Sequence, residues 1–401
     1  MHVRKIVAQI LNPCLQGLHA KRIESLRRAV EALMLGGVLS LSALALSLNS
    51  PARYKHRLKS MDRLIGSQAL HAKRADLYAE LAKRWLTGIN QVLVVVDWSD
   101  LTTDQRWHLL RASVVVEGRS LTLYEEVHPQ RRYGHPTVHR LFLCRLARIL
   151  PSGCRPIVMT DGGFHASWFK LVAKRGWAFV GRLRGRDLVR KGEGEWNSIK
   201  SLHGLAQPVS RDLGCYQYVR SNPIVVRLVL SQRPARGRHN LNLYGRPRSG
   251  RSSAKSARAA KEPWLLAASP KLNHLVADSI VRLYAQRMRI EQSFRDTKSL
   301  RVGQGLECAR SRSRERWEML RLIAHLGAFV QRLIGEAAKA SQLELNFMAT
   351  RRRAHAEISV LTLGRRILNS QAHWLSRLRP GASLPALSAQ AAFVCQFHHE
   401  T

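Results

Sequence analysis

The sequence predicts a mixed α/β protein whose central strands and helices are flanked by helical segments. Its 401 residues exceed a single ordinary core, which indicates several domains. Between residues 91 and 183, β-branched runs alternate with helical periodicity, whereas the segments before residue 85 and beyond residue 310 are predicted to be helical. Hydrophobic residues make up 45% and charged residues 23%, which is typical of a globular chain and excludes a disordered basic tail.

The net charge of the chain indicates its partner. Lysine and arginine number 66 against 27 aspartates and glutamates, so the formal net charge is +39. A folded protein with this excess of cations attracts polyanions. We therefore expect the chain to bind DNA or RNA through folded domains, and a charge of this size argues against a protein that has no polyanionic partner.

Cysteines and apolar segments indicate the compartment. The six cysteines form no CxxC pair, which favours free thiols in a reducing compartment over a disulfide framework or a zinc site. The most apolar stretch, residues 33–48, is shorter than the roughly twenty residues of a membrane span. Polar residues and a proline interrupt the N-terminal apolar run, so we expect neither a membrane segment nor a signal peptide.

Residues 1–88 predict a helical domain. Helical periodicity over residues 20–35 breaks at Gly36-Gly37 and then resumes, and a turn signal at Asn49-Ser50-Pro51 precedes a basic helix. A helix, a short turn and a basic helix outline a helix-turn-helix DNA reader, and a plain helical bundle with a solvated basic face is the alternative. The candidate DNA-contacting residues of the basic helix are Arg53, Lys55, Arg57 and Lys59.

The segment 89–183 predicts the first part of an α/β core. Residues 92–97 form a continuous β-branched run, as a buried strand requires, and Gly118-Arg119 marks the turn of a hairpin. A helix, a strand, a second helix and a final strand follow. This element order is that of the ribonuclease-H-like α/β fold. The expected elements are strand 92–97, hairpin 111–127, helix 137–150, strand 155–161, helix 167–176 and strand 177–183.

A β-rich basic insertion interrupts this core. Strands are expected at 215–219 and 224–230, and residues 233–261 contain nine Lys or Arg and no acid. The composition of this run predicts either a solvated loop or a loop that closes over a phosphate backbone. The core resumes with a strand at 263–269 and one long helix at 271–300. The expected domains are 1–88, 89–183, 184–262, 263–305 and 306–401, the last of them helical.

Carboxylates are the informative residues in so basic a chain. Asp97 and Asp161 are expected at the carboxyl ends of strands, where α/β proteins bind ligands, and Glu291 lies on the long helix. Two Asp and one Glu that converge can hold two Mg²⁺ ions, because hard cations prefer oxygen ligands. An Asp after a strand is, taken alone, more often a turn former or helix cap than a ligand, and Asp100 and Asp296 are nearby competitors.

Four polar residues share one face of the expected long helix. At 100° per residue, Tyr284, Arg287, Glu291 and Lys298 fall within about 60° over about 21 Å. A phenol, a guanidinium, a carboxylate and an ammonium on one face suit a phosphate track beside a metal ligand. The alternative is an exposed face with ordinary helical ion pairs.

These residues resemble a known family. Tyr284-x-x-Arg287-x-x-x-Glu291 followed by Lys298 is similar to the Tyr-Arg-Glu-Lys signature of bacterial DDE transposases of the insertion-sequence-four family. Further phrases, in family order, are similar to its insertion-sequence-ten-like members. They are VDWSD at 96–100, LRASVVVEGRSLTLYEE at 110–126, TDGGF at 160–164 and KEPWLLA at 261–267.

The resemblance implies roles for these residues and a fold for the chain. It implies Asp97, Asp161 and Glu291 as the catalytic triad that holds two Mg²⁺ ions, with Mn²⁺ able to substitute. The fold implied is a ribonuclease-H-like catalytic core with a β-rich insertion, flanked by N-terminal and C-terminal helical domains. The residues expected to hold the phosphates of the DNA end are Tyr284, Arg287 and Lys298.

Two further residues are candidate contacts to an unstacked base. Taken alone, Trp264 at a strand start reads as a core residue. In the family a tryptophan at this place stacks on a base flipped out of the duplex, which offsets the cost of extrusion. Met288, an apolar residue between two arginines, is the second candidate, as an inserted wedge.

The resemblance also implies the activity and the partners. It implies cut-and-paste transposition by end nicking, hairpin formation, hairpin opening and strand transfer, on double-stranded DNA of the element's ends and of the target. A homodimer in the bacterial cytoplasm, associated with the nucleoid, is expected, with the C-terminal helices as dimer surface or as plain core. The alternatives are a nuclease or resolvase on the same fold, and a DNA-binding regulator or architectural protein without catalysis.

Overall fold

The computed structural model divides into two compact units. Unit 1 comprises residues 1–155 and 288–396, and unit 2 comprises residues 156–287. Together they form a mixed α/β protein with many helices, as predicted. The structure describes residues 3–232, 261–301, 303–347, 358–369 and 372–396.

Unit 1 contains three antiparallel strands in the order β3-β2-β1. Its strands are β1 (Gln91–Asp100), β2 (Trp107–Val116) and β3 (Arg119–Pro129). The predicted hairpin is confirmed: β2 and β3 meet at Gly118, whose φ of 69° is left-handed and favours glycine. The predicted first strand is also confirmed, although it runs on to Asp100, so Asp97 lies within the strand and not at its end.

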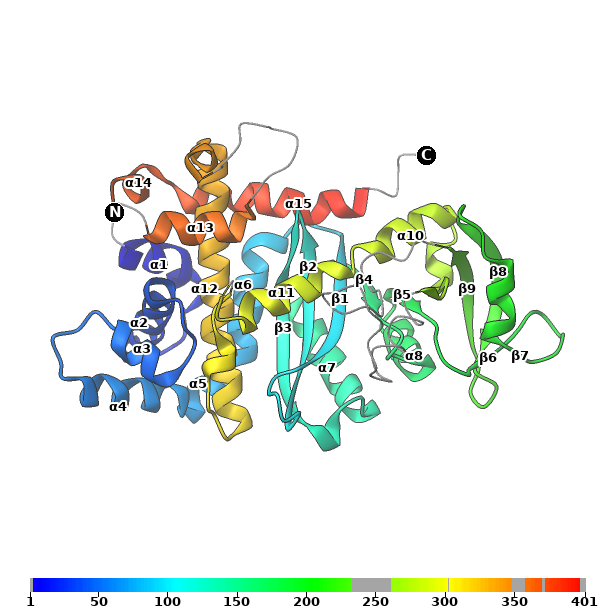
Figure 1. Ribbon diagram of the computed structural model, residues 1–401, viewed down its shortest axis with the longest axis horizontal. Coiled ribbons are helices and arrows are strands. Elements are labelled where there is room, and N and C mark those ends of the chain that lie inside the picture. The colour runs from blue at the N-terminus through cyan, green and yellow to red at the C-terminus, as the bar shows by residue number, and fades with distance from the viewer. Residues whose placement is uncertain (1–2, 233–260, 302, 348–357, 370–371, 397–401) are drawn as a thin grey trace, which may run out of the picture. The chain divides into compact units, whose positions relative to one another are not determined.

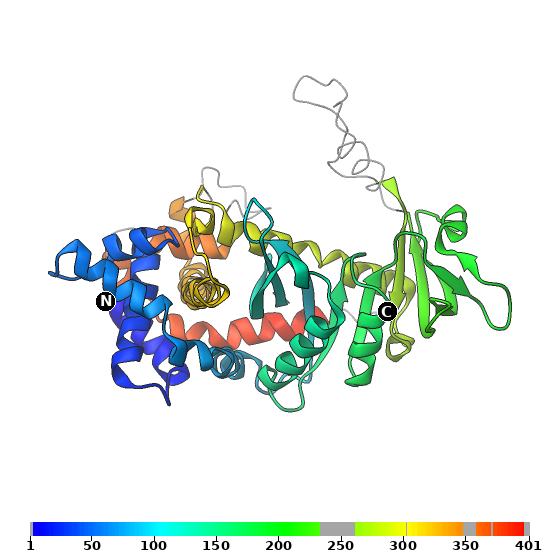
Figure 2. The same cartoon turned by 90° about the horizontal axis from the view of Figure 1, so that it is seen from below.

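Helices surround the strands of unit 1. Helix α11 packs on β3 and β1, α12 packs on β3, and α15 packs on β1 and β2. Figure 1 shows α11 in yellow crossing the strands, and Figure 2, which views α12 nearly end-on, shows α15 in red running past them. The helices of unit 1 are α1 (Val3–Leu11), α2 (Ala20–Gly36), α3 (Leu41–Ser47), α4 (Tyr54–Ile65), α5 (Gln68–Ala72), α6 (Arg74–Leu86), α7 (Pro136–Ile149), α11 (Met288–Lys298), α12 (Arg314–Ala340), α13 (Val360–Asn369), α14 (Ala372–Arg377) and α15 (Leu384–Gln396).

The strands of unit 2 lie in the order β4-β5-β10-β9-β8-β6-β7. Only β4 and β5 pair in parallel, as a strand–helix–strand crossover through α8 requires, and the remaining pairs are antiparallel. Helix α10 packs on β9, β5 and β8. The elements are β4 (Arg155–Thr160), α8 (Ala166–Lys174), β5 (Ala178–Arg182), β6 (Leu188–Arg190), β7 (Asn197–Ser198), β8 (Arg211–Tyr218), β9 (Ile224–Ser231), β10 (Trp264–Ala268) and α10 (Ala277–Ala285).

The single long helix expected over residues 271–300 is wrong. The chain forms α10, turns at Gln286-Arg287, and then forms α11. The N–H groups of Gln286 and Arg287 bond to carbonyls three residues back, which tightens and ends α10. The residues before the turn pack in unit 2 and those after it pack in unit 1, so different tertiary partners explain the break.

Other expectations are confirmed or lie outside the described residues. The expected helices at 20–35, 137–150 and 167–176 and the strands of the insertion are present within a few residues. The nine-cation run at 233–261 lies, except for Lys261, outside the described residues. The cysteines that the structure describes are free thiols, namely Cys14, Cys144, Cys154, Cys215 and Cys308.

No single helix in the described part of the chain is long and apolar enough to cross a membrane. Helices α2 and α3 meet the length and composition requirements only as a pair, and this pair is bent by 90° at its break.

Candidate active site

Asp97 lies on β1 directly after the buried residues of that strand. Residues 92–96 are fully buried, which fixes the strand in the core, whereas the Asp97 side chain is half-buried. Asp97 lies opposite Arg111 in the register of β1 and β2, and its Oδ1 accepts the backbone N–H of Trp98 at 2.8 Å. The apolar strand therefore presents a carboxylate at a partly exposed place.

Helix α11 carries Glu291 on its exposed side. Ile290, Phe294 and Thr297 recur at the spacing of one helical face and are buried. This face packs on β3 and β1, which leaves Glu291 exposed. The helix thus docks by its buried stripe and presents the Glu291 carboxylate to solvent.

The Lys298 ammonium lies at the end of β1. Its Nζ donates to the Ser99 hydroxyl at 2.6 Å and to the backbone carbonyl of Asp100. Burial, and after it the charge of Arg111, lowers the pKa of Lys298 to about 8, against the attraction of Asp100 and Asp97. Lys298 is therefore a cation at neutral pH that lies beside the strand of Asp97.

In unit 2, Asp161 directly follows β4 and is half-buried. Its Oδ1 accepts the N–H of Gly163 at 2.9 Å, which fixes the carboxylate in a turn of the chain. His165 follows at the start of α8. Asp187, whose carboxylate lies 3.6 Å from Nδ1 of His165, raises the pKa of His165, and Asp161 adds a smaller effect in the same direction.

Trp264 opens β10 and is half-buried, so it is not the fully enclosed core residue that its position alone suggests. Its ring stands edge-on to Tyr284, with the centroids 5.0 Å apart and the planes at 83°. Arg182 donates to the carbonyls of Glu262 and Pro263, immediately before Trp264, at 3.0 and 3.2 Å. An arginine and an aromatic neighbour therefore fix the place of the tryptophan.

Arg182 belongs to this cluster and was not found from the sequence. Burial raises the pKa of Tyr284, while the nearby charges of Arg287 and Arg182 oppose the shift. Burial, and after it the charge of Arg184, lowers the pKa of Arg182 to about 10, so Arg182 stays charged at neutral pH. The only sequence signal is a cation that ends an apolar strand.

The residues expected on one helical face do not share one helix. Tyr284 belongs to α10 and Arg287 to the turn after it, both in unit 2, whereas Glu291 and Lys298 belong to α11 in unit 1. The turn interrupts the constant angular step on which the expectation rested. Met288 begins α11 with 48% of its surface exposed.

The basic residues of the N-terminal domain divide into two kinds. Arg53, Lys55 and Lys59 are exposed at the start of α4 and along it. Arg57 instead donates to two backbone carbonyls at the end of α3, each at 3.2 Å. Arg57 therefore ties the two helices together, and the other three cations lie on the surface.

The carboxylates of unit 1 differ in their fitness for a metal ion. In the described part of the chain, no three His, Cys, Asp or Glu side chains form a group that could hold one. Asp97 and Glu291 lie on elements that pack together and neither is fully buried, whereas Glu125 is enclosed by two arginines. Carboxylate oxygens are the ligands that Mg²⁺ prefers, so the donor chemistry of Asp97 and Glu291 fits such an ion.

Comparison with known proteins gives the family. Residues 90–326 match the family described as transposase DDE domain, a span that covers more than half of the 401 residues and runs from before Asp97 to beyond Lys298. None of the curated proteins compared with the chain matches it. The matched span includes β1, β4 and α11, with the three acids predicted to be catalytic. The chain therefore belongs to the DDE transposases, enzymes that cleave and transfer strands of DNA.

Proposed function

We propose that this transposase is an insertion-sequence-ten-like member of the insertion-sequence-four family and moves its element by cut-and-paste. The observation that carries the proposal lies in unit 1. The ammonium of Lys298, on the helix that carries Glu291, donates to Ser99, two residues beyond Asp97. Two carboxylates and an ammonium on packed elements suit the handling of a phosphate beside a divalent cation.

Asp97, Asp161 and Glu291 are proposed to hold two Mg²⁺ ions, for which Mn²⁺ can substitute. Such ions activate an attacking oxygen and stabilise the charge on a leaving oxygen. The chain itself fixes the three carboxylates, because Asp97 lies within β1, Asp161 lies in a turn closed on Gly163, and Glu291 lies on the docked helix α11.

Tyr284, Arg287 and Lys298 are proposed to hold the phosphates of the transposon end. A guanidinium can grip a phosphate through two N–H groups, an ammonium acts as a point charge, and a phenol donates one neutral hydrogen bond. In unit 2 the charges of Arg287 and Arg182 both act on the buried Tyr284, so two cations accompany the phenol.

Trp264 is proposed to stack on a base flipped from the duplex. Its half-buried ring is fixed by Tyr284 and follows two residues that Arg182 holds, so a base can stack on it without prior rearrangement of the ring. Met288, exposed at the start of α11, is proposed as the wedge that enters the stack.

The proposed reaction consists of four in-line displacements. Water attacks a phosphodiester at the transposon end and releases a 3′ hydroxyl. That hydroxyl attacks the opposite strand, which forms a hairpin and frees the element from flanking DNA. Water then opens the hairpin, and the restored 3′ hydroxyl attacks a phosphodiester of the target DNA. Each step exchanges one phosphorus–oxygen bond for another, so one site can serve all four.

The domain organisation proposed for this activity follows the sequence. Residues 1–88 bind DNA, with the exposed Arg53, Lys55 and Lys59 as contacts and Arg57 holding α4 to the end of α3. Residues 89–183 and 263–305 form a ribonuclease-H-like core. Residues 184–262 are its basic insertion. Residues 306–401 form a helical domain, which we propose as the surface of a homodimer.

The test is incubation of the full chain with Mg²⁺ and duplex oligonucleotides that carry the terminal repeats flanking the gene. Nicked ends, hairpins and joined target DNA are the expected products, separated on denaturing gels. Nicks without hairpins would indicate a nuclease or resolvase in place of a cut-and-paste enzyme.

The second candidate function is a DNA-binding regulator or architectural protein. The net charge of +39 favours it as much as it favours a transposase, since either binds DNA. Binding of the terminal repeats without any Mg²⁺-dependent change in the DNA would support this candidate and contradict the proposed reaction.

A further inference from the structure

Two arginines of the β2–β3 hairpin donate hydrogen bonds to side chains of α11. Arg111 comes from the middle of β2, and Arg119 is the first residue of β3. Both donate to side chains of α11 that follow Glu291 closely in the sequence.

Arg111 is the deeper of the two. It is fully buried, and its Nη1 donates to the Ser293 hydroxyl at 2.8 Å. Its guanidinium carbon lies 4.5 Å from the centre of the Phe294 ring, a cation–π contact. Because its backbone lies opposite Asp97 in the sheet, Arg111 connects the strand of Asp97 to the helix of Glu291.

A buried ion network fixes Arg111 itself. Its Nε donates to Glu125 at 2.8 Å, and Glu125 accepts two further bonds from Arg321 of α12, at 3.1 and 3.0 Å, and one from the Tyr78 hydroxyl at 3.2 Å. Burial alone would raise the pKa of Glu125, but Arg321 and Arg111 outweigh it and lower the pKa to about 2. The guanidinium of Arg111 therefore keeps one position.

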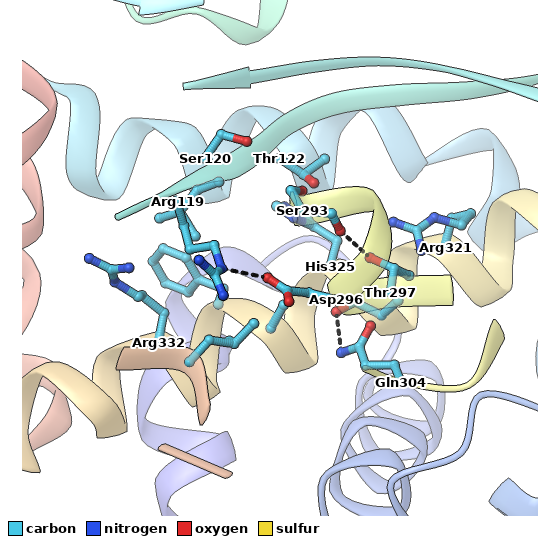
Figure 3. Close-up of a pocket in the computed structure, with 15 residues that line it drawn as sticks. Arg119, Ser120, Thr122, Ser293, Asp296, Thr297, Gln304, Arg321, His325 and Arg332 are labelled. Atoms are coloured by element: carbon cyan, nitrogen blue, oxygen red, sulfur yellow. Dashed lines mark hydrogen bonds and ion pairs between the residues drawn. The ribbon is translucent and has the colours of Figure 1, made fainter. Parts of the chain in front are cut away.

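Arg119 holds the outer side of the same helix. Its Nε donates to Asp296 and its Nη1 to Gln292, each at 2.9 Å. Figure 3 shows the bond from Arg119 to the Asp296 carboxylate, and both side chains line a small cavity together with Arg321 and Arg332. The Arg119 side chain is 18% exposed, so this clamp is close to the surface.

Arg111 and Arg119 together hold the part of α11 that carries Glu291. Gln292 and Ser293 are the two residues after Glu291, and each accepts a bond from a different arginine of the hairpin. A rotation or slide of α11 would break both bonds, and a two-pronged guanidinium is well suited to resist such a motion. The hairpin thus fixes the position of the backbone from which the Glu291 side chain extends.

We infer that Arg111 and Arg119 are positioning residues that fix Glu291 on α11 relative to Asp97 on β1. This inference rests on the proposed function, in which Asp97 and Glu291 hold divalent ions. Neither arginine touches the DNA or the ions in this scheme. Each acts through α11, so its loss weakens ion binding more than it weakens DNA binding.

The test replaces each arginine by lysine and measures Mn²⁺ binding to the full chain, from the electron paramagnetic resonance signal of free Mn²⁺. Arg119→Lys and Arg111→Lys keep the charge and lose the two-pronged geometry. We expect the Mn²⁺ concentration for half-saturation to rise about tenfold, as for loss of a residue that orients metal ligands. Affinity for end DNA in EDTA should stay within about twofold, because neither arginine contacts DNA in this scheme.

Matched controls separate positioning from general stability. Arg74→Lys removes a buried arginine that bonds the Glu125 carbonyl, and Arg332→Lys removes another from the cavity of Arg119. Arg74 bonds to Glu125 and Glu318, and Arg332 bonds to Glu117, Glu336 and Gln390, all of which lie outside α11. Both variants should therefore lower the melting temperature and leave Mn²⁺ half-saturation unchanged. If Arg111→Lys does not fold, the partly exposed Arg119→Lys carries the test.

The outcomes distinguish two failures. Folded Arg119→Lys and Arg111→Lys proteins that bind Mn²⁺ like the wild type would overturn the inference and leave the proposed function intact. Asp97→Asn and Glu291→Gln proteins that bind Mn²⁺ as tightly as the wild type does would instead overturn the proposed metal site, and the inference with it.

Discussion

Units 1 and 2 hold their buried arginines in different ways. In unit 1, Glu125 is fully buried between Arg111 and Arg321. In unit 2, the buried Arg227 pairs with Asp212, whose side chain is 43% exposed, and bonds otherwise to backbone carbonyls. Water screens the second pair and not the first. Unit 1, which carries two of the three candidate metal ligands, therefore depends on ion pairs closed to water for its geometry.

The largest effect is expected from breaking the ion network of unit 1. Glu125→Gln leaves Arg111 and Arg321 buried without a countercharge, so the free energy of unfolding should fall by about 3–5 kcal/mol. Asp212→Asn in unit 2 should cost at most about 1 kcal/mol, because that acid is partly exposed. Urea denaturation followed by circular dichroism measures both. Equal losses would show that the two units do not differ in this respect.

Acid should weaken unit 1 through His325. Burial lowers the pKa of His325 to about 4, against the attraction of Glu125. An unfolded histidine titrates near pH 6.5, so the unfolded chain gains a proton first, and the free energy of unfolding should fall by roughly 3 kcal/mol as the pH drops from about 6.5 to about 4. His325→Phe keeps the stack on Tyr78 and should flatten this pH dependence. An unchanged slope in the variant would contradict the buried neutral state of His325.

In unit 2 we expect an effect on a reaction step and not on stability. Trp264→Ala should slow hairpin formation about 5- to 150-fold more than first-strand nicking, because stacking on a flipped base contributes about 1–3 kcal/mol. Trp196→Ala, a half-buried tryptophan of the same unit, is the matched control and should affect neither step. Rates of both steps come from end-labelled DNA. Equal loss of nicking and hairpin formation would show that Trp264 contributes to packing and does not stack on a base.

The smallest effect concerns the charge of Lys298. With a pKa of about 8, Lys298 loses its proton at a lower pH than an ordinary lysine. If it holds a phosphate, the slope of log affinity for end DNA against log salt should decrease by about one as the pH rises from about 7 to about 9 in EDTA. Lys298→Met should show the smaller slope at both pH values. A slope that is independent of pH in the wild type would remove Lys298 from the phosphate contacts.

Local sequence predicts much of the fold and little of the ion network. The β-branched run before Asp97 and the glycine at Gly118 are strong local signals, and both elements form as expected. No local signal marks the turn at Gln286-Arg287, because it contains neither proline nor glycine. That turn arises because neighbouring residues pack in different units, which only tertiary structure reveals.

The same limit applies to the site. A chain with 66 lysines and arginines does not show which of them are buried, so Arg111 within an apolar strand and Arg182 at the end of another pass as ordinary cations. Acids are few and follow recognisable strands, which is why Asp97 and Asp161 could be named as candidates. Because acids are scarce, the carboxylates could be found from the sequence, and because cations are abundant, these two arginines could not.

The central claim is that Asp97, Asp161 and Glu291 together hold the ions that serve phosphodiester chemistry. The most direct measurement compares Mg²⁺-dependent nicking of end DNA by Asp97→Asn, Asp161→Asn and Glu291→Gln at concentrations that give equal DNA binding. Each variant should nick at least about a thousandfold more slowly than the wild type, because a bound metal ion contributes several kcal/mol to such a reaction. A variant that binds the end and nicks it at the wild-type rate would contradict the claim for that residue.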